Sequence, residues 1–263
     1  LAKVLKAIGY RTVCVHPYPA SFYGRDRVYP HLGFDEFIDI AAFAGAERAG
    51  PYIADLAVAT KVKAMLVGAS EPLFIFVITM ENHGPLHLEK PDSADYAACY
   101  TEYPPAGCDD LTVYLRHLGN ADRMMGELRT CLERHPRPAR LCWYGDHVPI
   151  MAEVYRQLGD PDGQTEYFIW SNRTATKKAP ATALSLDALA GLAVVRLRLL
   201  GRASWGGVLG CFFRLVERGG VHDQSRIADG RIVQLEPIIG DQFSRFGVGS
   251  RETAGDSEIE NPV

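Results

Sequence analysis

The 263-residue sequence lacks several features that would place it in a specialised class of protein. It has no run of eighteen apolar residues, so it gives no sign of a membrane-spanning helix. A formal net charge of only −4 argues against a bulk nucleic-acid-binding protein, and no nucleic-acid partner is expected. Neither a signal peptide nor an internal repeat is recognisable. With 47% hydrophobic residues, the chain is expected to bury a sizeable core.

The six cysteines also lack the spacing of a common kind of site. None of them forms a Cys-x-x-Cys pair, so a structural zinc site is not expected. Cys14 and Cys142 stand in apolar runs and are interpreted as buried core residues. Cys99 and Cys108 flank a Pro-Pro-Ala-Gly segment. A disulfide between these two is one alternative outside the cytoplasm, and two free thiols are the other.

What the sequence does contain is an alternation of helical and strand-like segments. Hydrophobic periodicity predicts helices over residues 2–8, 51–67, 109–134 and 183–200, and strands over 12–15, 73–79, 139–144 and 166–170. The segment after residue 16 and residues 86–108 have the composition of loops. This alternation favours an α/β fold with a mostly parallel central sheet flanked by helices on both faces.

Polar residues follow three of the predicted strands at the point where each strand ends. His16 follows the first, Asn82 and His83 follow the second, and Asp146 and His147 follow the third. Because the carboxyl ends of parallel strands meet at one edge of a sheet, we expect these side chains to converge. Aspartate and neutral histidine are ligands for Zn²⁺ or Mn²⁺, although one such pair needs two further ligands.

The loop after the first strand adds Tyr23 and Arg25 to this edge. Arginine offers a forked set of donors that suits phosphate or sulfate. His83, which precedes a Gly-Pro turn, is a candidate donor to the same anion or to a leaving group. These residue types together indicate metal-assisted transfer or hydrolysis of a phosphate or sulfate ester.

Each of these motifs also has a purely structural interpretation. Residues 145–147, Gly-Asp-His, are typical of a turn with a helix cap, and His83 is typical of a turn histidine. Arg25 and Asp26 are also compatible with a surface ion pair of little energetic weight. His117 and His135, in and just after the helix predicted over 109–134, are interpreted as structural residues.

Three blocks of the sequence, taken together, resemble the lipoteichoic acid synthase family. They are His16-Pro-Tyr-Pro-Ala-Ser-Phe-Tyr-Gly-Arg-Asp26 with Gly33-Phe-Asp-Glu-Phe37, then Asn82-His-Gly-Pro85, and then Tyr144-Gly-Asp-His147. Their order and spacing agree over roughly residues 1–175. The family belongs to the sulfatase-like part of the alkaline phosphatase superfamily. Its members are extracytoplasmic phosphoglycerol or phosphoethanolamine transferases and sulfatases.

The resemblance implies a role for each residue that matches a family motif. Asp146 and His147 match ligands of one divalent metal ion, with Mn²⁺ favoured and Mg²⁺, Zn²⁺ or Ca²⁺ as alternatives. His83 matches the histidine near the leaving or entering group. The residues that hold the anionic head group of the substrate match His16, Tyr23 and Arg25.

The resemblance also implies a substrate class and a location. It predicts an alkaline phosphatase-like fold that acts on phosphate or sulfate esters of cell-envelope or capsular glycans or glycolipids, at the extracytoplasmic face of the bacterial membrane. We favour phosphotransfer, because the sulfatase Cys/Ser-x-Pro-x-Arg signature is absent. The alternative is a catalytically inactive, sulfatase-like remnant that binds anionic glycan or a partner chain.

In the family, a threonine nucleophile and an acidic metal ligand precede the block that begins at His16. We therefore expect the nucleophile-bearing strand and a membrane anchor to belong to a longer protein. A catalytic domain is expected over residues 1–210, followed by an extension over 211–263 that is poorly ordered after about residue 240.

Overall fold

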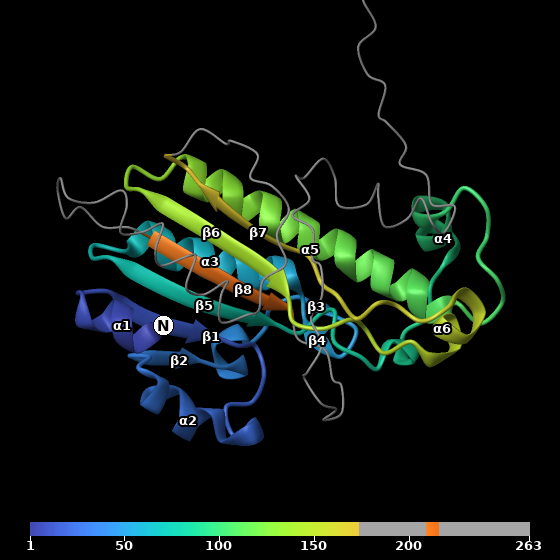
Figure 1. Cartoon of the computed structure of the whole chain (residues 1–263), viewed down its shortest axis with the longest axis horizontal. Helices are drawn as coiled ribbons and strands as arrows, with labels where there is room; N and C mark the ends of the chain where they lie inside the picture. The colour runs from blue at the N-terminus through green and yellow to red at the C-terminus, as the bar shows by residue number, and fades with distance from the viewer. Residues whose placement is uncertain (174–208, 216–263) are drawn as a thin grey trace, which may run out of the picture.

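The computed structural model describes residues 1–173 and 209–215. Its centre is a six-stranded sheet with the strand order β2-β1-β5-β8-β6-β7 (Figure 1). These strands are β1 (Arg11–Val15), β2 (Glu36–Ile38), β5 (Leu73–Thr79), β6 (Ala139–Gly145), β7 (Tyr167–Ser171) and β8 (Leu209–Leu215). All neighbours are parallel except β7, which runs antiparallel to β6. The prediction of a mostly parallel α/β sheet is confirmed.

Helices cover both faces of this sheet. They are α1 (Ala2–Ala7), α2 (Arg25–Leu32), α3 (Asp55–Gly68), α4 (Ser93–Cys99), α5 (Asp109–Glu133) and α6 (Ala152–Leu158). Three short 3₁₀ helices are η1 (Phe22–Gly24), η2 (Ile40–Phe43) and η3 (Leu86–Leu88), and a two-stranded ribbon pairs β3 (Arg48–Ala49) with β4 (Tyr52–Ile53). In Figure 1, α3 and α5 run along one face of the sheet, with α4 and α6 near one end of α5. None of the described helices combines the length and apolar character needed to span a membrane.

The apolar run of β5 is explained by burial on both sides. Ile75 and Val77 belong to the core cluster shared with α3 and α5, where Val62 and Leu128 are fully buried. Phe74 points into a second cluster on the opposite face. A strand covered on both faces loses the alternation of apolar and polar residues that marks a half-exposed strand.

Most predicted elements correspond closely to observed ones, but the predictions over residues 17–35 and 86–108 were incomplete. The first segment contains α2, and β2 follows it; the second contains η3 and α4. α4 begins with a capping box, in which Asp92 and Asp95 each accept a hydrogen bond from the other residue's backbone. The helix predicted from residue 51 begins instead at Asp55, because Tyr52 pairs with the preceding strand.

The C-terminal part of the chain contributes to the sheet itself. β8 lies between β5 and β6 and is parallel to both. The domain boundary expected after residue 210 falls inside this strand. Residues before and after that boundary pair with the same two strands, β5 and β6. The helix predicted over 183–200 and the segment after about residue 240 lie outside the described residues.

Cys99 and Cys108 are free thiols, so the disulfide that the sequence left open is not formed. Cys108 precedes α5 and is buried in an apolar cluster that includes Leu111 and Val154. Cys99 ends α4 and packs against the same cluster. Burial raises the pKa of both thiols, and nearby carboxylates raise it further. Each thiol therefore acts as a small apolar side chain.

Candidate active site at the carboxyl edge of the sheet

Three strand ends with polar side chains meet at one edge of the sheet, as predicted. β1, β5 and β6 point in the same direction, since β1 is parallel to β5 and β8 is parallel to both β5 and β6. His16 follows β1 directly, residues 80–85 follow β5, and Asp146 and His147 follow β6. This is the edge at which open α/β sheets build their binding sites.

His16 ties the ends of two strands together. Its side chain is fully buried, and its Nδ1 lies 3.0 Å from the backbone oxygen of Ile78 in β5. A carbonyl oxygen can only accept, so we assign the proton to Nδ1. The backbone amide of His16 in turn donates to the oxygen of Ile38, the last residue of β2. The imidazole is thus fixed in one tautomer and one orientation.

A chain of ring contacts connects His16 with His83. The ring centroids are 6.0 Å apart for His16 and Tyr18, 6.2 Å for Tyr18 and Tyr52, and 5.7 Å for Tyr52 and His83. The Tyr52 hydroxyl donates to the oxygen of Gly84 at 2.9 Å and lies 3.2 Å from Nδ1 of His83. Tyr18 and Tyr52 were not among the predicted site residues. For Tyr18, the signal in the sequence was the aromatic character of the loop after β1, whereas no signal pointed to Tyr52 in β4.

Tyr23 and Arg25 stand on a tight turn at the start of α2. Tyr23 has a φ of 54° and Gly24 a φ of 61°, a left-handed conformation that is costly for a bulky residue such as tyrosine. This turn brings the guanidinium of Arg25 to 5.2 Å from the ring of Phe22 and 5.5 Å from that of Tyr23. The Tyr23 side chain itself is 72% exposed, unlike the buried His16.

The charge of Arg25 reaches the end of β1. Burial raises the pKa of the Cys14 thiol well above its usual value, and the positive charge of Arg25 opposes this shift. Cys14 is the residue before the last of β1, so the guanidinium lies near the strand end that carries His16. The turn therefore places a cation at the carboxyl edge of the sheet.

Asp146 and His147 have the geometry of adjacent metal ligands. Asp146 Oδ2 lies 3.8 Å from Nε2 of His147, and the Asp146 side chain is only 3% exposed. Nδ1 of His147 lies 3.0 Å from the oxygen of Val148, so we assign the proton to Nδ1, which leaves Nε2 as the nitrogen with a lone pair suited to a metal ion. Two atoms at this separation fit bonds of about 2.1 Å to one ion.

The pair fits a metal ion but does not make a complete site. Within the described part of the chain, no three His, Cys, Asp or Glu side chains are grouped closely enough to hold a metal. A closed zinc site needs four ligands, and a catalytic one needs three from the protein. Asp146 and His147 are therefore suited to supply two ligands of a larger set.

A buried acidic cluster lies beside this edge and was not predicted. Glu81 follows β5, is fully buried, and accepts a hydrogen bond of 2.6 Å from the backbone amide of Asp55. Asn120 of α5 donates to its other carboxylate oxygen, and Asn82 lies 3.4 Å from the Asp55 carboxylate. Burial, and then the charge of Glu81, raise the pKa of Asp55 well above its usual value.

Comparisons with known proteins identify the family to which the chain is similar. A sequence model of the sulfatase family matches residues 1–193. The capsular polysaccharide biosynthesis protein RkpI of Rhizobium meliloti (strain 1021) is 32% identical over 172 residues, which cover 63% of this chain and 28% of RkpI. Lipoteichoic acid synthase 1 of Bacillus subtilis (strain 168) is 27% identical over 88 residues, which cover 33% of this chain and 14% of that protein.

A solved structure is similar as well. The phosphoglycerol transferase GacH of Streptococcus pyogenes, in complex with sn-glycerol-1-phosphate, matches with a TM-score of 0.51 and 28% identity, covering 65% of this chain and 45% of that chain. The chain thus spans less than half the length of each of these relatives. Because the family match extends over most of the 263 residues, the chain belongs to the sulfatase family.

Proposed function

We propose that this chain forms part of the active site of an enzyme that transfers or hydrolyses phosphate esters of cell-envelope or capsular glycans or glycolipids. The observation that carries the proposal is the convergence of His16, Arg25 and His83 at the sheet edge that also holds Asp146 and His147. The substrate class is supported by two relatives, one named for capsular polysaccharide biosynthesis and one for phosphoglycerol transfer. We place the reaction at the extracytoplasmic face of the membrane, with a membrane anchor in the intact protein.

Arg25, His16 and Tyr23 bind the anionic group of the substrate in this proposal. The guanidinium offers parallel N–H donors that match two phosphate oxygens, and its stacking on Phe22 and Tyr23 limits its rotation. Because Nδ1 of His16 is engaged with the backbone of β5, Nε2 is the atom assigned to the substrate. A rigid cation and a rigid imidazole discriminate between anions by geometry as well as by charge.

His83 exchanges a proton with the leaving or entering oxygen of the ester. Its Nδ1 lies 2.5 Å from the oxygen of Gly84 and 3.2 Å from the hydroxyl of Tyr52, and these contacts assign the proton to Nδ1 in the neutral ring. Nε2 is then the nitrogen that accepts a proton from an entering hydroxyl, or returns it to a leaving one.

We propose further that Asp146 and His147 contribute two ligands to one divalent metal ion, with Mn²⁺ favoured over Mg²⁺, Zn²⁺ and Ca²⁺. When bound, such an ion neutralises negative charge on the phosphoryl group and activates a nucleophile. Among the described residues, none matches the threonine nucleophile that the sequence resemblance implies. Thr12 is engaged instead with the oxygen of Gly33 at 2.8 Å and with Asp35 at 2.9 Å.

The proposal is tested by comparing a phosphodiester with an aryl sulfate as substrates of the intact protein. Arg25→Ala should lower kcat/KM for the phosphodiester about 100-fold, because a charged contact to the transferred group is lost. Arg11→Ala is the matched control, since Arg11 pairs with Glu36 at the opposite end of β1, and it should change kcat/KM less than about twofold.

Other outcomes separate the alternatives. Faster turnover of the aryl sulfate would replace phosphotransfer with sulfate hydrolysis. Binding of inorganic phosphate that is weakened by Arg25→Ala, without turnover of either substrate, would support the non-catalytic glycan-binding alternative. Equal activity of Arg25→Ala and the wild type would contradict the assigned site.

A further inference from the structure

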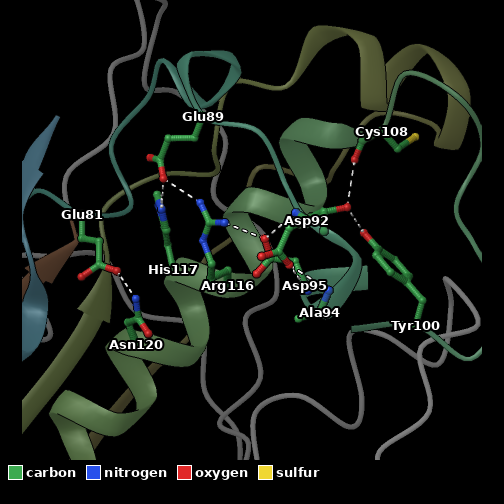
Figure 2. Close-up of polar contacts among 11 residues, drawn as sticks. Glu81, Glu89, Asp92, Ala94, Asp95, Tyr100, Cys108, Arg116, His117 and Asn120 are labelled. Carbon is green, nitrogen blue, oxygen red and sulfur yellow. Dashed lines mark hydrogen bonds and ion pairs between the residues drawn. The ribbon is translucent and has the colours of Figure 1, made fainter. Parts of the chain in front are cut away.

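The loop that carries His83 is held at both ends by one short stretch of helix α5. We define the His83 loop as residues 81–89, which connect the end of β5 to the segment before α4. Figure 2 shows Glu81 and Glu89, at the two ends of this loop, directed toward side chains of α5. The α5 residues involved are Arg116, His117 and Asn120, which fall within a little more than one helical turn.

The first end of the loop is fixed through Glu81. One carboxylate oxygen of this buried residue accepts from the side-chain amide of Asn120, and the other accepts from the backbone amide of Asp55 at 2.6 Å. Both oxygens are thus engaged by rigid helices. Hydrogen bonds to an ionised acceptor are about twice as strong as those between neutral groups.

The second end is fixed through Glu89. Its Oε2 accepts from Nη2 of Arg116 at 2.6 Å and lies 3.2 Å from Nε2 of His117. Nη1 of Arg116 donates to Asp95 at 2.6 Å, so the same arginine also holds the start of α4. The Glu89 side chain is 15% exposed and that of His117 only 2%, so water screens these contacts weakly.

The supporting helix is itself packed into the core. On neighbouring turns of α5, Ala121 and Met124 are buried against the sheet. The loop itself has few apolar anchors: Leu86 is buried, but Leu88 is 64% exposed. The orientation of His83 therefore depends on polar contacts at the loop ends more than on packing of the loop.

We propose that Arg116, His117 and Asn120 form a clamp that positions His83 for proton transfer. This inference rests on the proposed function, because it assigns the three residues as positioning residues for that reaction. They contact neither the anion-binding residues nor the metal pair in the proposed site; they act through the His83 loop. Loosening either end lets the imidazole leave the orientation that Tyr52 and Gly84 now fix.

The test compares His117→Leu, which removes the donor to Glu89, with His117→Gln, which retains one. Arg116→Ala serves as a second variant at a more exposed position, in case His117→Leu fails to fold. Arg129→Ala is the matched control on the same helix, because within residues 1–173 Arg129 pairs with Glu133 on the exposed surface and not with the His83 loop. Hydrogen exchange, the NMR signals of the His83 ring, and kcat and KM for a phosphodiester are measured on the intact protein.

His117→Leu should speed the exchange of amides in residues 82–89 at least about tenfold while leaving those of α3 unchanged. It should lower kcat about tenfold, keep KM within about twofold, and shift the His83 ring signals. His117→Gln and Arg129→Ala should resemble the wild type in each measurement.

Three results would overturn the clamp: exchange that rises equally in α3, a loop that exchanges at the wild-type rate, or a loosened loop with unchanged kcat and His83 signals. If the wild type turns over no phosphate ester, the proposed function fails by itself. The clamp is then decided by hydrogen exchange and by the His83 ring signals.

Discussion

At the scale of single residues, the ionisation of the buried Asp55 carboxyl group is opposed by its surroundings. It is fully buried, and a second buried carboxylate, that of Glu81, contacts its backbone amide. Burial and the charge of Glu81 both raise its pKa. Among the residues that the structure describes, no hydrogen-bond donor reaches one carboxylate oxygen of Asp55 or the side-chain oxygen of Asn82, and both atoms are buried. Protonation of the Asp55 carboxyl removes the charge repulsion with Glu81. It also lowers the cost of burying a carboxylate oxygen that accepts no hydrogen bond.

A pH dependence of stability follows from this environment. Since the folded-state pKa of Asp55 lies above its unfolded value of about 3.9, the native state holds the proton more tightly. The free energy of unfolding should therefore fall as pH rises from about 3.9 to the raised pKa, by at most about 1.4 kcal/mol per pH unit. Asp55→Asn should remove this pH dependence. The difference in free energy of unfolding between Asp55→Asn and the wild type, measured by urea unfolding, should therefore shift in favour of the variant from pH 5 to pH 8.

Asp35 provides a control of opposite sign. A hydrogen bond from Lys6 is the main cause that lowers its pKa, so its carboxylate contributes stability above its unfolded pKa, and this contribution is lost as pH falls through the folded value. Asp35→Asn should therefore destabilise the protein at neutral pH. If the free energy of unfolding of Asp55→Asn differed from that of the wild type by the same amount at pH 5 and pH 8, the raised pKa of Asp55 would be contradicted.

At the scale of elements, Gly33 fixes how helix α1 meets the turn between α2 and β2. It has a φ of 97°, and a Cβ built there would lie 2.7 Å from the backbone nitrogen of Lys3 and 2.8 Å from its Cα. Gly33→Ala should destabilise the protein by about 2–4 kcal/mol, because it combines an unfavourable backbone conformation with a clash against backbone.

Gly45→Ala separates the two contributions. Gly45 also has a positive φ, 75°, but a Cβ there would have no neighbour within 4 Å. Gly45→Ala should therefore lower the free energy of unfolding only by the cost of the backbone conformation, about 1–2 kcal/mol, as measured by denaturant unfolding. If Gly33→Ala and Gly45→Ala lowered the free energy of unfolding by the same amount, α1 would have moved away from residue 33 at no cost in stability.

The elements that the sequence predicted are those that bury an apolar face. β5 and α5 were located closely because their buried residues recur at the strand and helix periods. α2 and α4 have no buried residue, so no periodicity marks them, and α2 also contains Pro30. Only the capping-box spacing of Asp92 and Asp95 signalled α4.

The residues of the candidate site also fall into those that the sequence could predict and those that it could not. The position of residues that directly follow a strand, such as His16 and Asp146, could be predicted because strand direction alone places them at this edge. Tyr52 and Asn120 were missed, because their roles depend on contacts with residues 31 and 39 positions away along the chain. Sequence periodicity carries no information about such contacts.

At the scale of the whole molecule, the proposed metal site predicts that a bound ion stabilises the intact protein, because an ion held by Asp146 and His147 would bind the folded chain and not the unfolded one. Mn²⁺ at about 100 times its Kd should add about 2.7 kcal/mol to the free energy of unfolding, which is a rise in Tm of roughly 5–10 °C for a domain of this size. His147→Ala should abolish the rise, whereas His31→Ala, on exposed α2, should keep it. An equal rise in His147→Ala would place the metal elsewhere.

The position of β8 sets the order in which the site can be assembled during synthesis. β1 and β5, with His16 and His83, lie on one side of this strand, and β6, with Asp146 and His147, lies on the other. When the ribosome has synthesised all of these site residues, it has not yet synthesised residues 209–215. These residues form the strand that joins the two groups of strands. At about 5–20 residues per second, the nascent chain spends several seconds with the facing edges of β5 and β6 unpaired. Chaperone capture and misassembly should concentrate in that interval.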